Sequence, residues 1–383
     1  MVRLNDDKEM VNITHTPEKE QEKIFIKEKC YRLNKVLRDF GIKAVPITEE
    51  NVLVAARFVR FKIELRSGET IRNLEKYKQD ISREIEAFGE IMIDNIKGTR
   101  YVGMDVPFEK SGNTLELLNN LDLLNSSNGN LDVLAGQKPD SSIDIFDVSK
   151  APHILISGTT GSGKTVFLYS MIVSLISQHS KEDLEIVIVD PKQTDFHFFK
   201  GIPQLRDNKI ITDPEEALRM LDEINSIEKE RRTQLLIESN SRDIESYNTK
   251  NPSNRMKRLV VFIDEYADLV KAAEMLGIRK DFEARLCMLA QRVRNLGIHL
   301  VIATQRPSAT IVTTALKANI PVRISFRLPA HQDSMTILDR TGAEDLLGKG
   351  DMLALTETDY YRIQGFYISE EQLQEYLRKL KNE

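Results

Sequence analysis

The 383-residue chain contains no tryptophan, two cysteines and six histidines, and each scarcity excludes a class of protein. Cys30 and Cys287 stand far apart in the sequence, so they indicate neither a disulfide framework nor a metal-ligand pair. The scattered histidines lack the spacing of a zinc site. No apolar run is long enough to span a bilayer, and the polar N-terminus is unlike a signal peptide. We therefore expect a protein of the reducing cytosol that meets a membrane only through a partner.

Acidic residues are also missing from one stretch. The net charge is −5, which by itself argues against a nucleic-acid partner. Residues 284–332, however, contain no Asp or Glu, and their basic residues are Arg285, Arg292, Arg294, Arg306, Lys317, Arg323 and Arg327. A basic block of this kind can hold a phosphate backbone while the rest of the surface is acidic. The alternative is chance clustering on a solvated face.

Pattern changes divide the chain into four segments. Residues 1–16 are polar and aperiodic and predict a disordered arm. Residues 17–110 combine helical and strand periodicities, including a helix from Thr70 to Phe88, and predict a small α+β subdomain. Residues 111–152 are expected to be a connector, with an edge strand at 143–148. Residues 153–383 alternate strand and helix patterns, which predicts an α/β domain with a mostly parallel sheet, helices on both faces and a C-terminal amphipathic helix.

The central motif is a glycine-rich stretch between a predicted strand and a predicted helix. Its residues are Gly158, Thr159, Thr160, Gly161, Ser162, Gly163, Lys164 and Thr165. This G-x-x-x-x-G-K-T pattern is typical of a phosphate-binding loop, whose backbone N–H groups surround the β-phosphate. Lys164 would reach the β- and γ-phosphates, and Thr165 would hold Mg²⁺. A plain Gly/Ser turn is the alternative, but strand, loop and helix are the context that ATP and Mg²⁺ binding require.

Polar residues also end three later predicted strands. They are Asp190, the pair Asp264–Glu265, and Gln305. Because ligands bind at the carboxyl ends of parallel strands, we expect these side chains beside the phosphate loop. Asp264 would hold Mg²⁺, and Glu265 would act as the general base for the attacking water. Gln305 would sense the γ-phosphate. The alternatives are a surface acid that begins a helix for Glu265 and a strand cap for Gln305.

The order of these strands separates classes of nucleotide enzymes. A strand at 184–190 lies between the phosphate loop and Asp264 in the sequence, and a glutamate follows that acid. This order suits the additional-strand ATPases better than kinases or GTPases. The transition state at the γ-phosphate also needs a positive charge, and Arg292 and Arg294 are too far along the chain to be assigned to the same subunit's site. A ring, in which one subunit's arginine reaches the next subunit's nucleotide, would supply that charge.

Several motifs resemble those of the FtsK/SpoIIIE family of DNA translocases. They are the segment from Ile154 to Thr165, Val189–Lys192, Val261–Leu269, Gly297–Ser308, Lys317–Arg323 and Gly342–Leu353. The resemblance covers residues 153–368 closely and 17–110 more loosely. It implies a RecA-like ATPase core and a homohexameric ring that moves double-stranded DNA through its centre. It also implies that Arg294 is the arginine finger and that Arg306 and Lys317 face the DNA channel.

The chain departs from the large members of that family in three respects. It shows no N-terminal membrane helices and no winged-helix domain after the motor, and it has Met335 where many relatives have arginine. We therefore do not expect septum anchoring or sequence-directed polarity. Three functions remain open: a DNA translocase, a coupling or HerA-like motor that serves a nuclease, relaxase or secretion channel, and an ATP-gated DNA-binding scaffold with little turnover.

Overall fold

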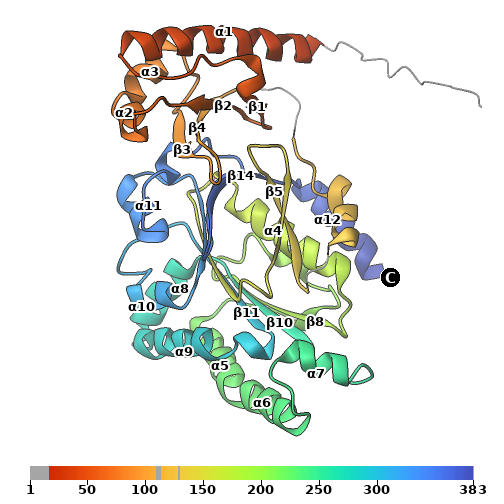
Figure 1. The fold of residues 1–383 in the computed structure, drawn as a ribbon. Helices are drawn as coiled ribbons and strands as arrows, with labels where there is room; N and C mark the ends of the chain where they lie inside the picture. The colour runs from red at the N-terminus through yellow and green to blue at the C-terminus, as the bar shows by residue number, and fades with distance from the viewer. Residues whose placement is uncertain (1–16, 109–113, 128–129, 383) are drawn as a thin grey trace, which may run out of the picture. The chain divides into compact units, whose positions relative to one another are not determined.

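The chain comprises two compact units, Met1–Ser111 and Gly112–Glu383, in a computed structural model that describes residues 17–108, 114–127 and 130–382 (Figure 1). The arm predicted at residues 1–16 lies outside the described residues.

The first unit is a helix-covered antiparallel sheet. Its strands, in spatial order, are β1 (Val52–Val54), β2 (Phe58–Glu64), β4 (Tyr101–Pro107) and β3 (Met92–Asn95). Its helices are α1 (Pro17–Asp39), η1 (Glu49–Asn51), α2 (Ile71–Lys76) and α3 (Lys78–Glu84). Leu33 and Leu37 of α1 share one core with Phe61 and Met104 of the sheet. This periodic burial is what the sequence pattern predicts for an α+β unit.

The helix expected from Thr70 to Phe88 is instead two short helices. The chain leaves helical geometry at Tyr77, whose φ and ψ are −101° and 13°. The Tyr77 ring stacks on Phe40 with centroids 5.0 Å apart. The second helix ends near Ile85, because Glu86 adopts a positive φ of 50°. A tertiary ring contact thus overrides a continuous helical pattern.

The second unit is built on one ten-stranded sheet. Its strands, in spatial order, are β6 (Ile143–Asp147), β5 (Asp132–Gln137), β14 (Tyr360–Gly365), β13 (Asp351–Leu355), β12 (Val322–Phe326), β7 (His153–Ser157), β11 (Ile298–Thr304), β10 (Arg258–Ile263), β8 (Leu184–Val189) and β9 (Leu205–Ile211). Strands β12 to β9 run parallel, and the pairs from β6 to β12 are antiparallel. The α/β class and the mostly parallel sheet are confirmed.

Four strands of this sheet do not follow from the sequence pattern: β5, β9, β13 and β14. Strand β9 has a charged centre, in which Asp207 and Asn208 take positive φ values of 53° and 51°. Strands β5 and β6 lie within residues 111–152, so this stretch is not only a connector but part of the large sheet. The strand expected at 143–148 is β6, at the sheet edge.

Helices cover both faces of the sheet. They are α4 (Lys164–Gln178), α5 (Pro214–Glu223), α6 (Lys229–Glu238), α7 (Ile244–Lys250), α8 (Tyr266–Met275), α9 (Arg279–Arg292), α10 (Thr314–Ala318), α11 (His331–Leu338) and α12 (Glu370–Asn382). The unit also has the 3₁₀ helices η2 (Leu118–Ser126), η3 (His197–Phe199), η5 (Arg294–Leu296) and η6 (Ala343–Asp345), and the π-helix η4 (Ile224–Glu228). Helices α4 and α12 pack in one core on one face, and α5, α8 and α9 pack together on the other (Figure 1). None of the described helices combines the length and apolarity needed to cross a bilayer.

Two buried histidines lie at the amino ends of adjacent strands of this sheet. His153 begins β7 and His299 lies in β11, and each side chain is 1% exposed. Burial disfavours the charged imidazolium, so it lowers the pKa of His153 to about 4 and that of His299 to about 3. The folded chain therefore holds both rings neutral where an unfolded chain would protonate them.

These histidines should make the chain less stable as the pH falls. The unfolded pKa is 6.5 and the folded pKa of His153 is about 4. The unfolded chain therefore binds more protons below pH 6.5, and stability declines by about 1.4 kcal/mol per pH unit per histidine. Urea unfolding from about pH 7.5 to about pH 5 measures how the free energy of unfolding changes with pH. His299→Gln should reduce this slope by about the contribution of one histidine. The exposed His331→Gln is the control; equal slopes in wild type and His299→Gln would contradict the prediction.

Candidate active site

The glycine-rich loop connects β7 to α4 and needs its glycines for two reasons. Gly161 and Gly163 have φ values of 75° and 108°, which favour glycine. Space is also missing: a Cβ on Gly158 would lie 2.5 Å from Ser162 Oγ, and one on Gly163 would lie 2.4 Å from the Gly350 nitrogen. The Gly350 N–H donates to the Ser162 carbonyl at 2.8 Å. The loop is thus supported from behind by the turn before β13.

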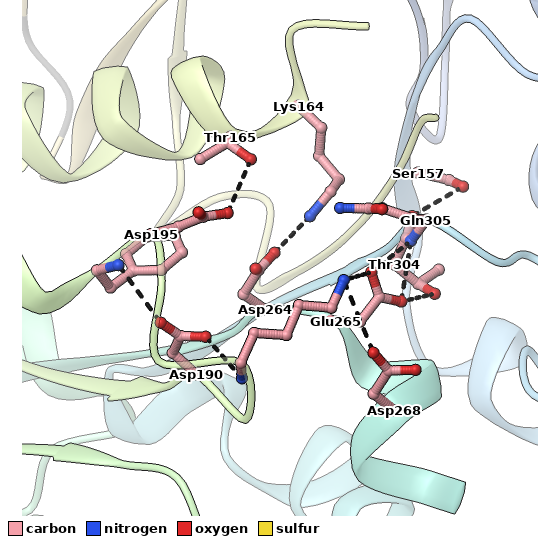
Figure 2. Close-up of polar contacts among 12 residues, drawn as sticks. Ser157, Lys164, Thr165, Asp190, Asp195, Asp264, Glu265, Asp268, Thr304 and Gln305 are labelled. Carbon is pink, nitrogen blue, oxygen red and sulfur yellow. Dashed lines mark hydrogen bonds and ion pairs between the residues drawn. The ribbon is translucent and has the colours of Figure 1, made fainter. Parts of the chain in front are cut away.

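Lys164, the first residue of α4, pairs with Asp264 at the end of β10. Both side chains are 2% exposed, and Figure 2 shows Lys164 Nζ directed at the carboxylate. Burial raises the pKa of Asp264; Lys164 opposes this rise, and Asp195 and Glu265 add to it. In this state the lysine neutralises an acid of its own site. A triphosphate would offer Lys164 a stronger partner, because its oxygens carry more charge.

The residues near Thr165 suit Mg²⁺. Asp264 Oδ2 and Ser162 Oγ are buried without a hydrogen-bond partner. Thr165 Oγ1 lies 3.5 Å from Asp195 Oδ2 (Figure 2). Mg²⁺ prefers one or two carboxylates plus phosphate oxygens and water, so a hydroxyl, an unsatisfied carboxylate oxygen and a nearby acid fit it. The described residues include no cluster of three or more His, Cys, Asp or Glu side chains that could hold a metal ion.

Glu265 follows Asp264 directly and takes a left-handed conformation, with φ of 50° and ψ of 59°. That conformation is costly for a side chain other than glycine and is typical of functional positions. Glu265 is 1% exposed. Its Oε1 accepts from Thr304 Oγ1 at 3.2 Å and from the Gln305 N–H at 3.1 Å (Figure 2). The strained backbone thus directs this carboxylate towards the end of β11.

Gln305 joins the phosphate loop to Glu265. Its backbone N–H donates to Glu265, and its side-chain Oε1 accepts from Thr160 Oγ1 at 3.1 Å. A residue that touches both the loop and the candidate base can report whether a γ-phosphate is present. The arrangement brings together Lys164, Thr165, Asp264, Glu265 and Gln305, as expected from the sequence.

The structure assigns Asp190 a different task from the other strand-end residues. Its Oδ1 accepts the backbone N–H groups of Lys192 and Gln193, both at 3.1 Å. Asp190 therefore caps the turn after β8 and does not point a free carboxylate into the site. The turn supplies two residues to which the sequence analysis gave no role: Lys192, at 3.1 Å from Glu265 Oε2, and Asp195. The sequence signals were a polar run after a buried strand and, for Lys192, the family motif Val189–Lys192, which assigned the lysine no role.

Arg294 does not reach the phosphate loop of its own subunit. It lies in η5, before the amino end of β11, and its side chain is exposed. Gln305 follows the carboxyl end of the same strand, so the two residues are about 20 Å apart by strand length. Arg294 borders a hollow of about 240 Å³ with Asp243, Glu245 and His299. The expectation that it serves a different subunit remains a prediction.

The basic block is partly neutralised by acids from outside it. Arg306 is exposed, one residue beyond Gln305. Lys317 in α10 instead donates to Asp339 Oδ1 at 2.7 Å, and Arg323 pairs with the same acid. Arg285 pairs with Asp222. Arg306 therefore fits a role on DNA more directly than Lys317 does, and both assignments remain predictions.

Comparisons with known sequences agree with these motifs. The profile of the FtsK/SpoIIIE family matches residues 124–309. A DNA translocase FtsK from Caldanaerobacter subterraneus subsp. tengcongensis is 37% identical over 92% of this chain and 49% of its own length. The Haemophilus influenzae DNA translocase FtsK is 33% identical over 91% of this chain and 69% of its own length. The chain spans about half the length of most of the curated relatives that it matches. For three of these DNA translocases the share is 49%, 39% and 49% of the relative's own length.

Solved structures of other ATPases share the fold of this chain. The pCW3 conjugation coupling protein TcpA, in a monomer form with ATPγS, superposes with a TM-score of 0.64 at 24% identity, covering 92% of this chain and 99% of that one. The cytoplasmic domain of the Thermomonospora curvata type VII secretion ATPase EccC gives 0.60 at 25% identity, covering 70% and 34%. With the phosphate loop, Asp264, Glu265 and Gln305 at one sheet edge and these relatives in sequence, the chain belongs to the FtsK/SpoIIIE family.

Proposed function

We propose that this chain hydrolyses ATP to move double-stranded DNA, and that it works as a homohexameric ring. The observation that carries the proposal is the position of Glu265 and Gln305 at the edge that holds Lys164, Thr165 and Asp264. A general base and a γ-phosphate sensor beside a phosphate loop suit hydrolysis better than binding alone. Membership of the FtsK/SpoIIIE family supports DNA as the substrate that is moved.

Each residue of the site has a task in this mechanism. The loop N–H groups and Lys164 bind the phosphates, once Lys164 leaves Asp264. Thr165 and Asp264 would hold Mg²⁺, which would supply positive charge to the β- and γ-phosphates. Glu265 orients the attacking water and accepts its proton. Gln305 contacts the γ-phosphate and, through Thr160, passes its presence or absence to the loop.

The residues at the two ends of β11 support the proposed ring. Gln305 lies at the carboxyl end of this strand, and Arg294 precedes its amino end. Head-to-tail subunits would place Arg294 of one chain at the nucleotide of the next, and such an interface forms a ring when its rotation closes. The exposed Arg306, next to the sensor Gln305, would then convey nucleotide state to DNA. Its contacts would be to phosphates and so largely independent of sequence.

Replacing the candidate base should stop turnover but not binding. Glu265→Gln keeps the shape of the side chain and removes its proton acceptance, so kcat should fall about 10²- to 10³-fold. Phosphate release measures kcat, and a fluorescent ATP analogue measures affinity, which should stay near wild type. Glu230→Gln, on the exposed surface of α6, is the matched control. A Glu265→Gln protein that hydrolyses ATP at the wild-type rate would contradict this role.

Arg294→Ala and Lys164→Ala should each be inactive, whereas a mixture of the two should recover activity. An interface between an intact phosphate loop and an intact Arg294 forms at about a quarter of the contacts in randomly mixed rings. ATPase assays on subunits that are unfolded, mixed and refolded together measure this recovery. Arg292→Ala, two residues away and exposed, is the control and should stay active. A mixture no more active than its components would argue against a shared site.

Duplex DNA should stimulate hydrolysis, and the interaction should weaken as salt rises. Arg306→Ala should lower DNA affinity equally for unrelated sequences and reduce the slope of log K against log salt by about one. Fluorescence anisotropy with labelled duplexes at several salt concentrations gives both quantities. Arg378→Ala, exposed on α12, should leave them unchanged. If duplex DNA neither binds nor stimulates hydrolysis, the translocase proposal is wrong.

A further inference from the structure

Both oxygens of the candidate base Glu265 accept hydrogen bonds from the protein. Its Oε1 accepts from Thr304 Oγ1 and from the Gln305 N–H. Its Oε2 accepts from Lys192 Nζ at 3.1 Å and, more weakly, from the same N–H at 3.3 Å. These contacts come from three donors, because the Gln305 N–H is shared between the two oxygens. In this arrangement Lys192 occupies a position on Oε2, and it is the one charged donor among the three.

We propose that Lys192 is a positioning residue that holds Glu265 in this resting state, and that its transfer to Asp268 releases the base. This inference rests on the proposed hydrolysis of ATP and adds its regulation.

Lys192 has the charge and the freedom for such a transfer. Burial works against its charge, but the carboxylates of Glu265, Asp268 and Asp264 outweigh burial and raise the pKa of Lys192. The lysine therefore keeps its proton wherever it lies within this acidic group. Its side chain is 34% exposed, whereas Glu265 is 1% exposed. The mobile partner of the pair is the lysine.

Asp268 is a second partner within reach. Its Oδ2 lies 3.7 Å from Lys192 Nζ, and it is one turn further along α8 than Glu265. A short swing of the lysine chain would exchange one carboxylate for the other, so the lysine itself stays paired. The Glu265 carboxylate would keep its hydrogen bonds from Thr304 and Gln305 at the end of β11. Release thus opens the position on Oε2 that Lys192 held.

The loop that carries Lys192 also reaches the other half of the site. Residues 190–196, here called the β8 loop, are held by Asp190, whose oxygens accept backbone N–H groups at Lys192, Gln193 and Phe196. The same loop places Asp195 beside Thr165. Gln193 within it has a positive φ of 59°. A nucleotide that contacts Thr165 therefore touches the segment on which Lys192 is mounted.

Two variants should change the DNA-free ATPase rate in opposite directions. Lys192→Met removes the charge that holds Glu265, so kcat without DNA should rise about fivefold and DNA stimulation should shrink towards one. Asp268→Asn removes the competing partner, so kcat without DNA should fall while full DNA still restores the rate. KM for ATP should change less than about twofold in both. Lys192→Arg can still pair with Glu265 and should restore wild-type behaviour.

The controls separate this inference from the proposed function. Lys200→Met removes an exposed lysine outside the site and should behave as wild type. A wild-type chain without ATPase activity overturns the proposed function itself. If wild type hydrolyses ATP but Lys192→Met leaves kcat unchanged, or lowers it with and without DNA by the same factor, the inference alone is overturned. If Lys192→Met loses thermal stability, Asp268→Asn provides the independent test. A lower DNA-free rate in Asp268→Asn, with DNA stimulation preserved, supports the transfer.

Discussion

The alignment of β7, β11 and β10 is the constraint on which the whole site depends. In this parallel register Thr304 pairs with Ser157, and Ile302 pairs with Ile263. The phosphate loop begins just after Ser157, Gln305 follows Thr304, and Asp264 follows Ile263. A shift of one residue in any of these strands would turn its alternating side chains to the other face. The register therefore converts three segments far apart in the sequence into one cluster of side chains.

Charge neutralisation inside the site follows from that clustering. Lys164 is paired with Asp264, and Lys192 with Glu265. Leaving any one of these charges buried and alone would be costly, so each pair is the state expected without a phosphate group. A triphosphate changes the balance, because it gives the loop cation a better partner and leaves the acid to a divalent ion. In the proposed mechanism, binding and activation would therefore be linked through these two ion pairs.

The fold also separates Arg294 from the other candidate catalytic residues. A parallel strand has its two ends at opposite edges of the sheet, so β11 carries Gln305 at one edge and Arg294 before the other. At the end of the sheet that carries the phosphate loop, Gly163 packs against Gly350 so closely that no side chain fits between them. This contact fixes the position of the loop. Nucleotide chemistry is therefore concentrated at one edge, and the opposite edge presents its charge outward.

The sequence by itself determined the phosphate loop, the five core strands that carry or flank the candidate site and the α/β class, because local motifs and long apolar runs encode them directly. It could not determine the parallel edge strand β9, which has a charged centre, or the antiparallel strand β5, which lies in a stretch that resembles a connector. Along the chain, the strand at 184–190 is the next predicted strand after the one before the phosphate loop. In the sheet, however, β11 lies between β7 and β10, which only the tertiary structure shows. Tertiary structure alone also revealed Lys192 and Asp195 beside Glu265 and Thr165, and the pairing of Lys317 with Asp339. The physical reason is that contacts between side chains from different strands depend on register and backbone direction, which no local pattern records.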